Sequence, residues 1–156
     1  MSHPMTLKGK QELDKELNQL IKIDREEVKR AIAEAREHGD LKENAEYHSA
    51  KEKQGHIEGR IAELQGKIAG ANVIDVANLD SEKIVFGATV TLYSDEKDET
   101  KTIQIVGEDE ASSEDNKISY NSPLGKALIG KEEGDEVIVK APKGNITYEI
   151  ESFEYK

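Results

Sequence analysis

The sequence predicts an α+β protein in two parts. Residues 1–76 are expected to form an antiparallel coiled-coil helical hairpin, and residues 77–156 a twisted antiparallel β domain with one short helix. The apolar residues of the first part recur at spacings of three and four, whereas those of the second part tend to alternate. The chain has no Trp and only two Phe, and 35% of its residues are charged, which suits a narrow buried seam better than one large core.

The first helix is expected over residues 7–37, where the chain contains no proline. One gap near Asp24 interrupts the helical spacing of its apolar residues. This gap predicts a shift of register within a continuous helix, because the apolar stripe resumes on the far side of it. The apolar positions of this helix are Leu13, Leu17, Leu20, Val28, Ile32 and Ala35.

The second helix follows after a connection of only residues 38–40, in which Gly39 is the expected stop of the first helix. So short a connection makes the two helices antiparallel neighbours. Its apolar positions step alternately by three and four residues, as in a coiled-coil seam. Gly55, Gly59 and Gly66 are expected to permit a close approach between the helices at some cost in helix stability. A hairpin that covers its own seam predicts a monomer. The seam positions are Tyr47, Ala50, Gln54, Ile57, Ile61, Leu64, Ile68 and Ala71.

After residue 76 the chain consists of short β-rich runs separated by polar turns. One helix signal lies among them. Ser122 can cap a helix, Pro123 suits its first position, and Gly130 can end it. The expected strands are 84–93, 102–106, 117–120, 137–140 and 146–151.

The formal net charge of −11 argues against several classes of protein. So acidic a chain is a poor autonomous binder of nucleic-acid phosphates, and any action on a transcript would pass through a protein partner. The absence of cysteine excludes disulfides and thiolate metal sites. No run of about 20 apolar residues is present to cross a membrane, and the N-terminus has no secretory pattern, so a cytoplasmic protein is expected.

Two carboxylates, Asp40 and Glu43, stand where the two helices meet. Their spacing is that of a capping box, in which Asp40 caps the second helix and Glu43 reaches back to the Asp40 amide. On spacing alone this structural interpretation is favoured over a functional one, although one does not exclude the other. Mg²⁺ is usually held by one or two protein carboxylates together with phosphate and water. Any such ion would therefore be shared with another macromolecule.

Two cations, Arg36 and Lys51, lie behind these carboxylates on the first and second helix. The pattern favours a solvated coiled-coil flank, and the alternative is contact with a nucleic-acid strand through charge, without base readout. Tyr47, at the start of the apolar seam, is expected to pack between the helices more readily than to stack on a base.

Two long segments, AIAEAREHGDLKENAEY at 31–47 and SYNSPLGKALIG at 119–130, resemble the signatures of the bacterial Gre elongation factors. Within that family the strongly acidic chain is more like the GreA branch than the more basic GreB branch. The resemblance implies an FKBP-like fold for the β domain. It also implies a factor that is not itself an enzyme: it would bind RNA polymerase, enter its secondary channel and stimulate the polymerase's own Mg²⁺-dependent cleavage of backtracked RNA.

The same resemblance assigns roles to particular residues. Asp40 and Glu43 become the catalytic acidic tip, which supports Mg²⁺ and the attacking water; the ion would be shared with the polymerase and not held tightly by the isolated protein. Arg36 and Lys51 become the contact to the 3′ end of the nascent RNA. The polymerase-docking surface is assigned to Ser122, Pro123 and Leu124, for which the helix-cap explanation stands equally well.

Three other functions remain open at this stage. A protein of the same architecture could occupy the channel as an inhibitor, but such proteins carry a more acidic tip. An FKBP-like prolyl isomerase or chaperone would need an aromatic-lined pocket, and Phe86 and Phe153 are the only phenylalanines of the chain. A plain coiled-coil interaction module would tolerate alanine at Asp40 without loss of function.

Overall fold

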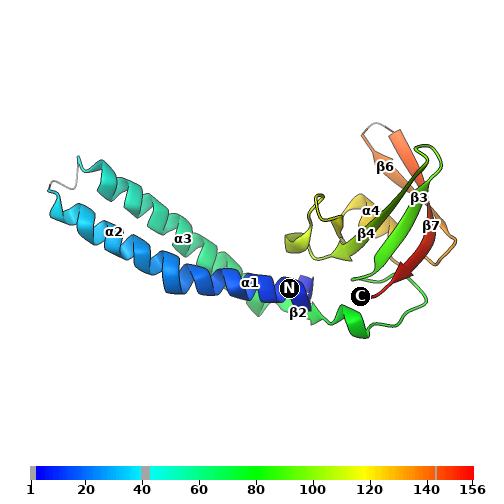
Figure 1. Ribbon diagram of the computed structural model, residues 1–156, viewed down its shortest axis with the longest axis horizontal. Helices are drawn as coiled ribbons and strands as arrows, with labels where there is room; N and C mark the ends of the chain where they lie inside the picture. The colour runs from blue at the N-terminus through cyan, green and yellow to red at the C-terminus, as the bar shows by residue number, and fades with distance from the viewer. Residues whose placement is uncertain (1–2, 40–42, 143) are drawn as a thin grey trace. The chain divides into compact units, whose positions relative to one another are not determined.

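The computed structural model describes residues 3–39, 43–142 and 144–156, so Asp40 lies outside the described residues. It confirms the predicted α+β class, with a helical hairpin and a curled, mostly antiparallel sheet that carries a short helix (Figure 1). The chain divides into two compact units. One is Lys10–Ala71, and the other joins the segment that ends at Gly9 to Asn72–Lys156. The sequence pattern did not suggest that the first residues would group with the sheet.

The hairpin consists of two antiparallel arms that lie side by side (Figure 1). The first arm contains two α-helices joined by a π-helical turn, and the second arm is a single α-helix. In chain order these elements are α1 (Leu7–Gln19), the π-helical turn (Leu20–Asp24), α2 (Arg25–Glu37) and α3 (Ala45–Ala69).

The π-helical turn confirms the predicted shift of register. The amide of Arg25 donates to the carbonyl oxygen of Leu20, a bond across five residues that takes one more residue into the turn than an α-helix does. The extra residue rotates the apolar stripe, which accounts for the gap in spacing near Asp24. As a result, side chains before, within and after the turn pack against Ile57 and Ile61 of α3. They are Leu17, Leu20, Ile21 and Val28.

The predicted seam of α3 is confirmed for most of its length, since Ala50, Ile57, Ile61 and Leu64 are buried. Its last position is wrong, because α3 ends at Ala69 and Ala71 begins a strand. The expected close approach at the glycines is also wrong. A side chain added at Gly55, Gly59 or Gly66 would meet nothing within 4 Å.

Two bidentate ion pairs join the arms on either side of the π-helical turn. Arg25 donates from Nε and Nη2 to Glu58, with both distances 2.8 Å. Arg60 donates from Nη2 and Nε to Glu16 at 2.8 and 3.1 Å. The two pairs have opposite polarity, since the acid lies on the first arm in one and on the second arm in the other. A slip of one arm along the other would break both, so together they favour one register.

The larger sheet has the strand order β5-β4-β3-β7-β6. Its neighbouring strands are antiparallel except for β4 and β5, which are parallel; that pairing was not predicted. The first expected strand is shorter than predicted, because it begins at Thr89 and leaves Ile84 in the preceding segment. The strands are β3 (Thr89–Ser94), β4 (Glu99–Val106), β5 (Lys117–Ser119), β6 (Glu136–Ala141) and β7 (Gly144–Glu154).

One face of this sheet holds the core, and α4 (Pro123–Leu128) packs on it. The predicted cap is confirmed, because the Ser122 hydroxyl accepts from the amide of Gly125 at 3.1 Å. Gly130 follows the helix with φ of 90°, as its predicted role as the stop requires. The buried residues of the core are Ile84, Ala88, Val90, Leu92, Ile103, Ile105, Leu128, Val137, Tyr148 and Ile150.

A second, two-stranded sheet, which was not predicted from the sequence, pairs β1 (His3–Thr6) with β2 (Ala71–Ile74). The Glu110 carboxylate, in a 3₁₀ turn (Glu108–Glu110) after β4, accepts from the amides of Thr6 and Gly107, both at 3.0 Å. It also accepts from the Thr6 hydroxyl. These bonds fasten β1 to the segment after β4. A further 3₁₀ turn, Val76–Asn78, follows β2. No helix in the described part of the chain is long and apolar enough to cross a membrane.

Candidate functional site

The first arm ends at its predicted stop. The amide of His38 donates to the carbonyl oxygen of Ala35 at 3.2 Å, which closes the last turn of α2. Gly39 follows with φ of 120°, a backbone conformation that is strained for any residue with a side chain. The prediction that Gly39 ends the first helix is therefore confirmed.

The second arm begins differently from the prediction. The helix α3 starts at Ala45, and its cap is Asn44, whose Oδ1 accepts from the amide of Tyr47 at 3.1 Å. The predicted capping box, with Asp40 as the cap and Glu43 three residues on, is therefore wrong for α3. Asn and Asp are equally good caps, and the prediction rested on Asp40 alone, without weighing Asn44 four residues later.

The same asparagine also reaches back to the first arm. Its Nδ2 donates to the carbonyl oxygen of Ala35, nine residues earlier in the chain. Ala35 is only 2% exposed, so its backbone is fixed by the packing of α2. Asn44 therefore joins the end of one helix to the start of the next, and the sequence analysis did not single it out.

Glu43, the described member of the predicted acidic pair, is exposed directly before this cap. Together with His38, Asn44, Ala45 and Glu46 it lines an open hollow at the end of the hairpin. Asp40 lies outside the described residues. Glu43 is thus exposed at the tip, next to a residue that forms hydrogen bonds to both arms.

Carboxylate oxygens are ligands that Mg²⁺ prefers, and Glu43 offers such a group in the open. Within residues 3–39, 43–142 and 144–156, no three His, Asp or Glu side chains gather as a metal site of the chain's own would need. The Glu43 carboxylate is thus chemically suited to be one ligand of such an ion, and the sharing of that ion with a second macromolecule stays a prediction.

Both predicted cations are exposed, and each has a contact within the hairpin. The guanidinium carbon of Arg36 lies 5.8 Å from the centre of the Tyr47 ring, across from α2 to α3. Lys51 donates to Gln54 at 3.2 Å on the surface of α3. Tyr47 is half-buried, and the contact of its ring with Arg36 joins α3 to α2 beside the tip.

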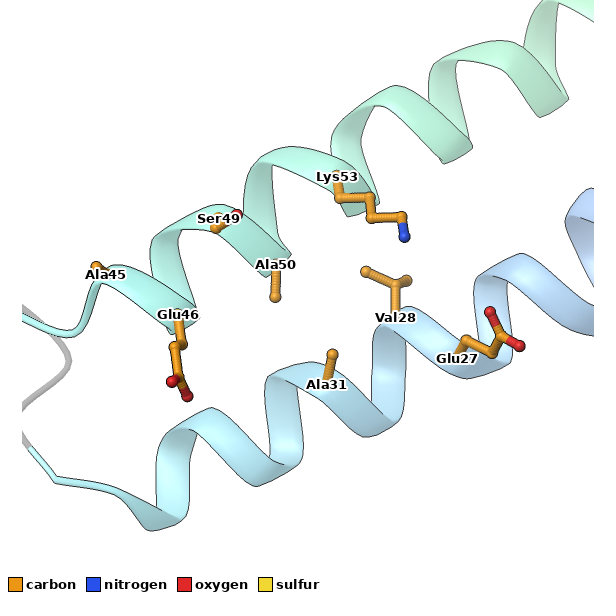
Figure 2. Close-up of a pocket in the computed structure, with 8 residues that line it drawn as sticks. All are labelled: Glu27, Val28, Ala31, Ala45, Glu46, Ser49, Ala50 and Lys53. Carbon is orange, nitrogen blue, oxygen red and sulfur yellow. The ribbon is translucent and has the colours of Figure 1, made fainter.

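Behind the tip, α2 and α3 leave an open groove of about 440 Å³ (Figure 2). Figure 2 shows Val28 and Ala31 of α2 pointing toward Ala50 of α3, and the amine of Lys53 extending toward α2. Several of the lining side chains are small, and Val28 and Ala50 are themselves buried. The remaining lining residues are Glu27, Ala45, Glu46 and Ser49.

The residues predicted for docking lie at the start of α4. Ser122 caps this helix and donates to the Ser119 carbonyl at 2.6 Å, while Leu124 is half-buried against the core. Ser122 and Leu124 thus have structural roles of their own, and Pro123 is exposed. The docking role of the three residues stays a prediction.

Comparison with known proteins identifies the class to which this hairpin and sheet belong. Residues 3–73 match the family described as "Transcription elongation factor, N-terminal", and residues 79–155 match "Transcription elongation factor, GreA/GreB, C-term". The chain belongs to the GreA/GreB family of transcription elongation factors, which confirms the predicted family. Membership favours an elongation factor over a prolyl isomerase or a plain coiled-coil module.

Individual relatives agree with this assignment over nearly the full length. Transcription elongation factor GreA of Halorhodospira halophila is 56% identical over 154 residues, with 98% of each chain covered. The GreA of Francisella tularensis subsp. novicida is 54% identical over 154 residues, which cover 98% of this chain and 96% of that one. Among solved structures, GreA factor homolog 1 (Gfh1) of Thermus thermophilus is 25% identical with a TM-score of 0.45 and 99% of each chain covered.

Proposed function

We propose that the protein binds RNA polymerase, extends its hairpin into the secondary channel and stimulates the polymerase's own cleavage of backtracked RNA. Release of the 3′ fragment would leave a new 3′ end in the active centre and rescue the arrested complex. Membership of the GreA/GreB family supports this function. The structural observation that carries it is an exposed Glu43 at the end of a hairpin whose two helices are joined directly behind it.

In this proposal the tip supplies carboxylates and the polymerase supplies the rest of the active centre. Asp40 and Glu43 would be ligands of a Mg²⁺ ion shared with the polymerase. Bound there, the ion supplies Lewis-acid activation of the attacking water and stabilises charge on the scissile phosphate. Glu43, at the end of the hairpin in the secondary channel, would orient that water. The protein is accordingly an activator and not an enzyme in its own right.

The cations would hold the RNA in place. Arg36 and Lys51 contact phosphates of the displaced 3′ segment, which gives binding without sequence preference. The Tyr47 ring under the Arg36 guanidinium limits the motion of that side chain before RNA arrives. Pro123, with Ser122 and Leu124, would dock against the polymerase outside the channel. Because the net charge is −11, affinity for the elongation complex must come mainly from this protein contact.

The proposal is tested with a backtracked elongation complex that carries labelled RNA, with transcript shortening followed in Mg²⁺ with and without the protein. Asp40→Ala is expected to abolish most of the stimulation, and Glu43→Gln to lower it to a smaller extent, with polymerase binding intact in both variants. Glu46→Gln is the matched control, because Glu46 lines the same hollow and is also exposed.

Three results would contradict the proposal. If the unmodified protein binds polymerase but slows cleavage, the protein is a channel inhibitor. If Glu43→Gln and Glu46→Gln behave alike, the chemistry does not depend on the tip position that we assign. If the protein does not bind polymerase, the proposed partner is wrong.

A further inference from the structure

The side chain of Asn44 forms hydrogen bonds both to the end of α2 and to the first turn of α3. Asn44 accepts from the Tyr47 amide through Oδ1 at 3.1 Å, and this bond starts α3. Through Nδ2 it donates to the Ala35 carbonyl near the end of α2. The acceptor on α2 is rigid, because Ala35 is 2% exposed and its carbonyl also closes the last helical turn to His38. A single carboxamide thus connects two helix ends that the chain joins only through the tip.

We infer that Asn44 is a positioning residue that fixes Glu43 relative to the first arm of the hairpin. The inference rests on the proposed function for its consequence in cleavage, and on the two hydrogen bonds for its structural content. Glu43 directly precedes Asn44 in the chain, so the hydrogen bonds of Asn44 restrict the backbone of Glu43 on one side. A displacement of about 1 Å at a catalytic group can lower a rate about 100-fold, so this anchorage matters for a carboxylate that meets its partner inside another protein.

The chemistry of the site requires asparagine in particular. Asp, Ser and Asn are comparable as helix caps, because each has an oxygen that accepts from the first turn. Among these three, only asparagine also has an N–H group on the same side chain. Asp in this position would place a carboxylate oxygen against the Ala35 carbonyl, where two acceptors repel. A substitution at Asn44 can therefore remove the hydrogen bond to Ala35 and still keep the cap of α3.

The test is Asn44→Asp, which keeps the cap and removes the donor. In the cleavage assay, the maximal rate at saturating protein is expected to fall at least tenfold, while the protein concentration that gives half of this rate stays unchanged. The helical circular dichroism and its melting temperature are expected to stay near those of the unmodified protein. Asn18→Asp is the control, because it makes the same chemical change at an exposed position of α1.

A second readout does not depend on cleavage. In ¹⁵N relaxation of the full chain, the order parameter of the Glu43 amide is expected to fall in Asn44→Asp and to remain unchanged in Asn18→Asp. If the unmodified protein does not stimulate cleavage, the proposed function fails, and this measurement alone decides whether Asn44 positions Glu43. An unchanged order parameter, or a cleavage rate like that of the unmodified protein, overturns the inference.

If Asn44→Asp lowers the melting temperature, the effect of losing the hydrogen bond to Ala35 is tested with Asn44→Ser instead. Serine retains a capping oxygen, adds no charge and is too short to replace the bond to Ala35. The same loss of maximal rate and of order at Glu43 in this folded variant supports the inference. Full activity with an ordered Glu43 shows that Asn44 serves only as a cap.

Discussion

The contact between Arg36 and Tyr47 joins the two arms of the hairpin and involves a cation of the candidate site. Tyr47 is half-buried near the start of α3, and the centre of its ring lies 5.8 Å from the guanidinium carbon of Arg36. Such contacts are worth about 0.5–1 kcal/mol at an exposed site. That is too little to determine whether the hairpin folds, but it is enough to bias one long side chain toward one place.

Replacing Tyr47 by leucine is therefore expected to slow cleavage several-fold while the hairpin stays folded. Leucine keeps the apolar contact in the seam and removes the π face under Arg36. Tyr47→Phe keeps the face and is expected to behave like the unmodified protein, so this variant is the control. The measurement is the cleavage rate in the backtracked complex. Equal rates for the leucine and phenylalanine variants would show that the ring does not order Arg36.

Two glycines give opposite predictions for the same substitution. In α4, a Cβ at Gly125 would lie 2.3 Å from the Ser119 carbonyl oxygen, which belongs to the backbone and cannot move aside cheaply. Gly125→Ala is expected to cost about 1–3 kcal/mol. In α3, a Cβ at Gly55 would meet nothing within 4 Å, so Gly55→Ala is expected to add about 1 kcal/mol. Urea unfolding of both variants measures the two changes, and effects of the same sign would contradict the prediction.

At the scale of elements, the hairpin combines an apolar seam with charged pairs that join its arms. The hydrogen bond from Arg25 holds the pKa of Glu58 below its usual range. The pKa of Glu63 is lowered as well, first by the hydrogen bond from Lys67 and then by that from Arg60. Both carboxylates are at the surface, where water screens the attraction, so these pairs contribute little to stability. Of the two, only Glu58 pairs across the arms and can favour one register, because both partners of Glu63 lie with it on α3.

The lowered pKa values predict how the hairpin responds to acid. A carboxylate with a lower pKa in the folded state stabilises the fold above its unfolded pKa, and this contribution is lost as pH falls through the folded value. Helical melting temperature is therefore expected to drop as the pH falls below about 4.3, the ordinary pKa of glutamate. Arg25→Gln should remove part of that dependence, and Arg30→Gln, at an exposed position of α2, should not. Identical pH profiles for the two variants would exclude a role for the pair with Glu58.

Elements with a repeating pattern could be predicted from the sequence, and those without one could not. The steps of three and four gave both arms, and a single gap near Asp24 gave the register shift. The cap of α3 was misplaced because Asp40 and Asn44 have equal capping strength and only packing selects between them. The strand β1 was missed because four residues carry no period and their anchor, Glu110, lies 104 residues from Thr6 in the chain. The parallel pairing of β5 likewise depends on a long-range contact that no local pattern encodes.

On the scale of the whole molecule, the net charge favours binding to the polymerase over direct binding to free RNA. With a net charge of −11, the chain repels free nucleic acid, although Arg36 and Lys51 are exposed. The isolated protein is therefore expected to bind single-stranded RNA more weakly than about 10⁻⁴ M, the weak end of ordinary non-specific binding. Fluorescence anisotropy with a labelled oligonucleotide at physiological salt checks this. Micromolar binding that weakens steeply with salt would show that the cations act without the polymerase.

Because of the π-helical turn at Leu20–Asp24, the length of the first arm does not follow directly from its number of residues. An α-helix rises about 1.5 Å for each residue, but a residue taken into a wider turn adds mainly to the girth of the helix. The apolar residues on both sides of the turn still meet α3, so the second arm needs no matching insertion. A single-residue insertion or deletion at this turn can therefore be tolerated in one arm alone, with little change in how far the hairpin reaches.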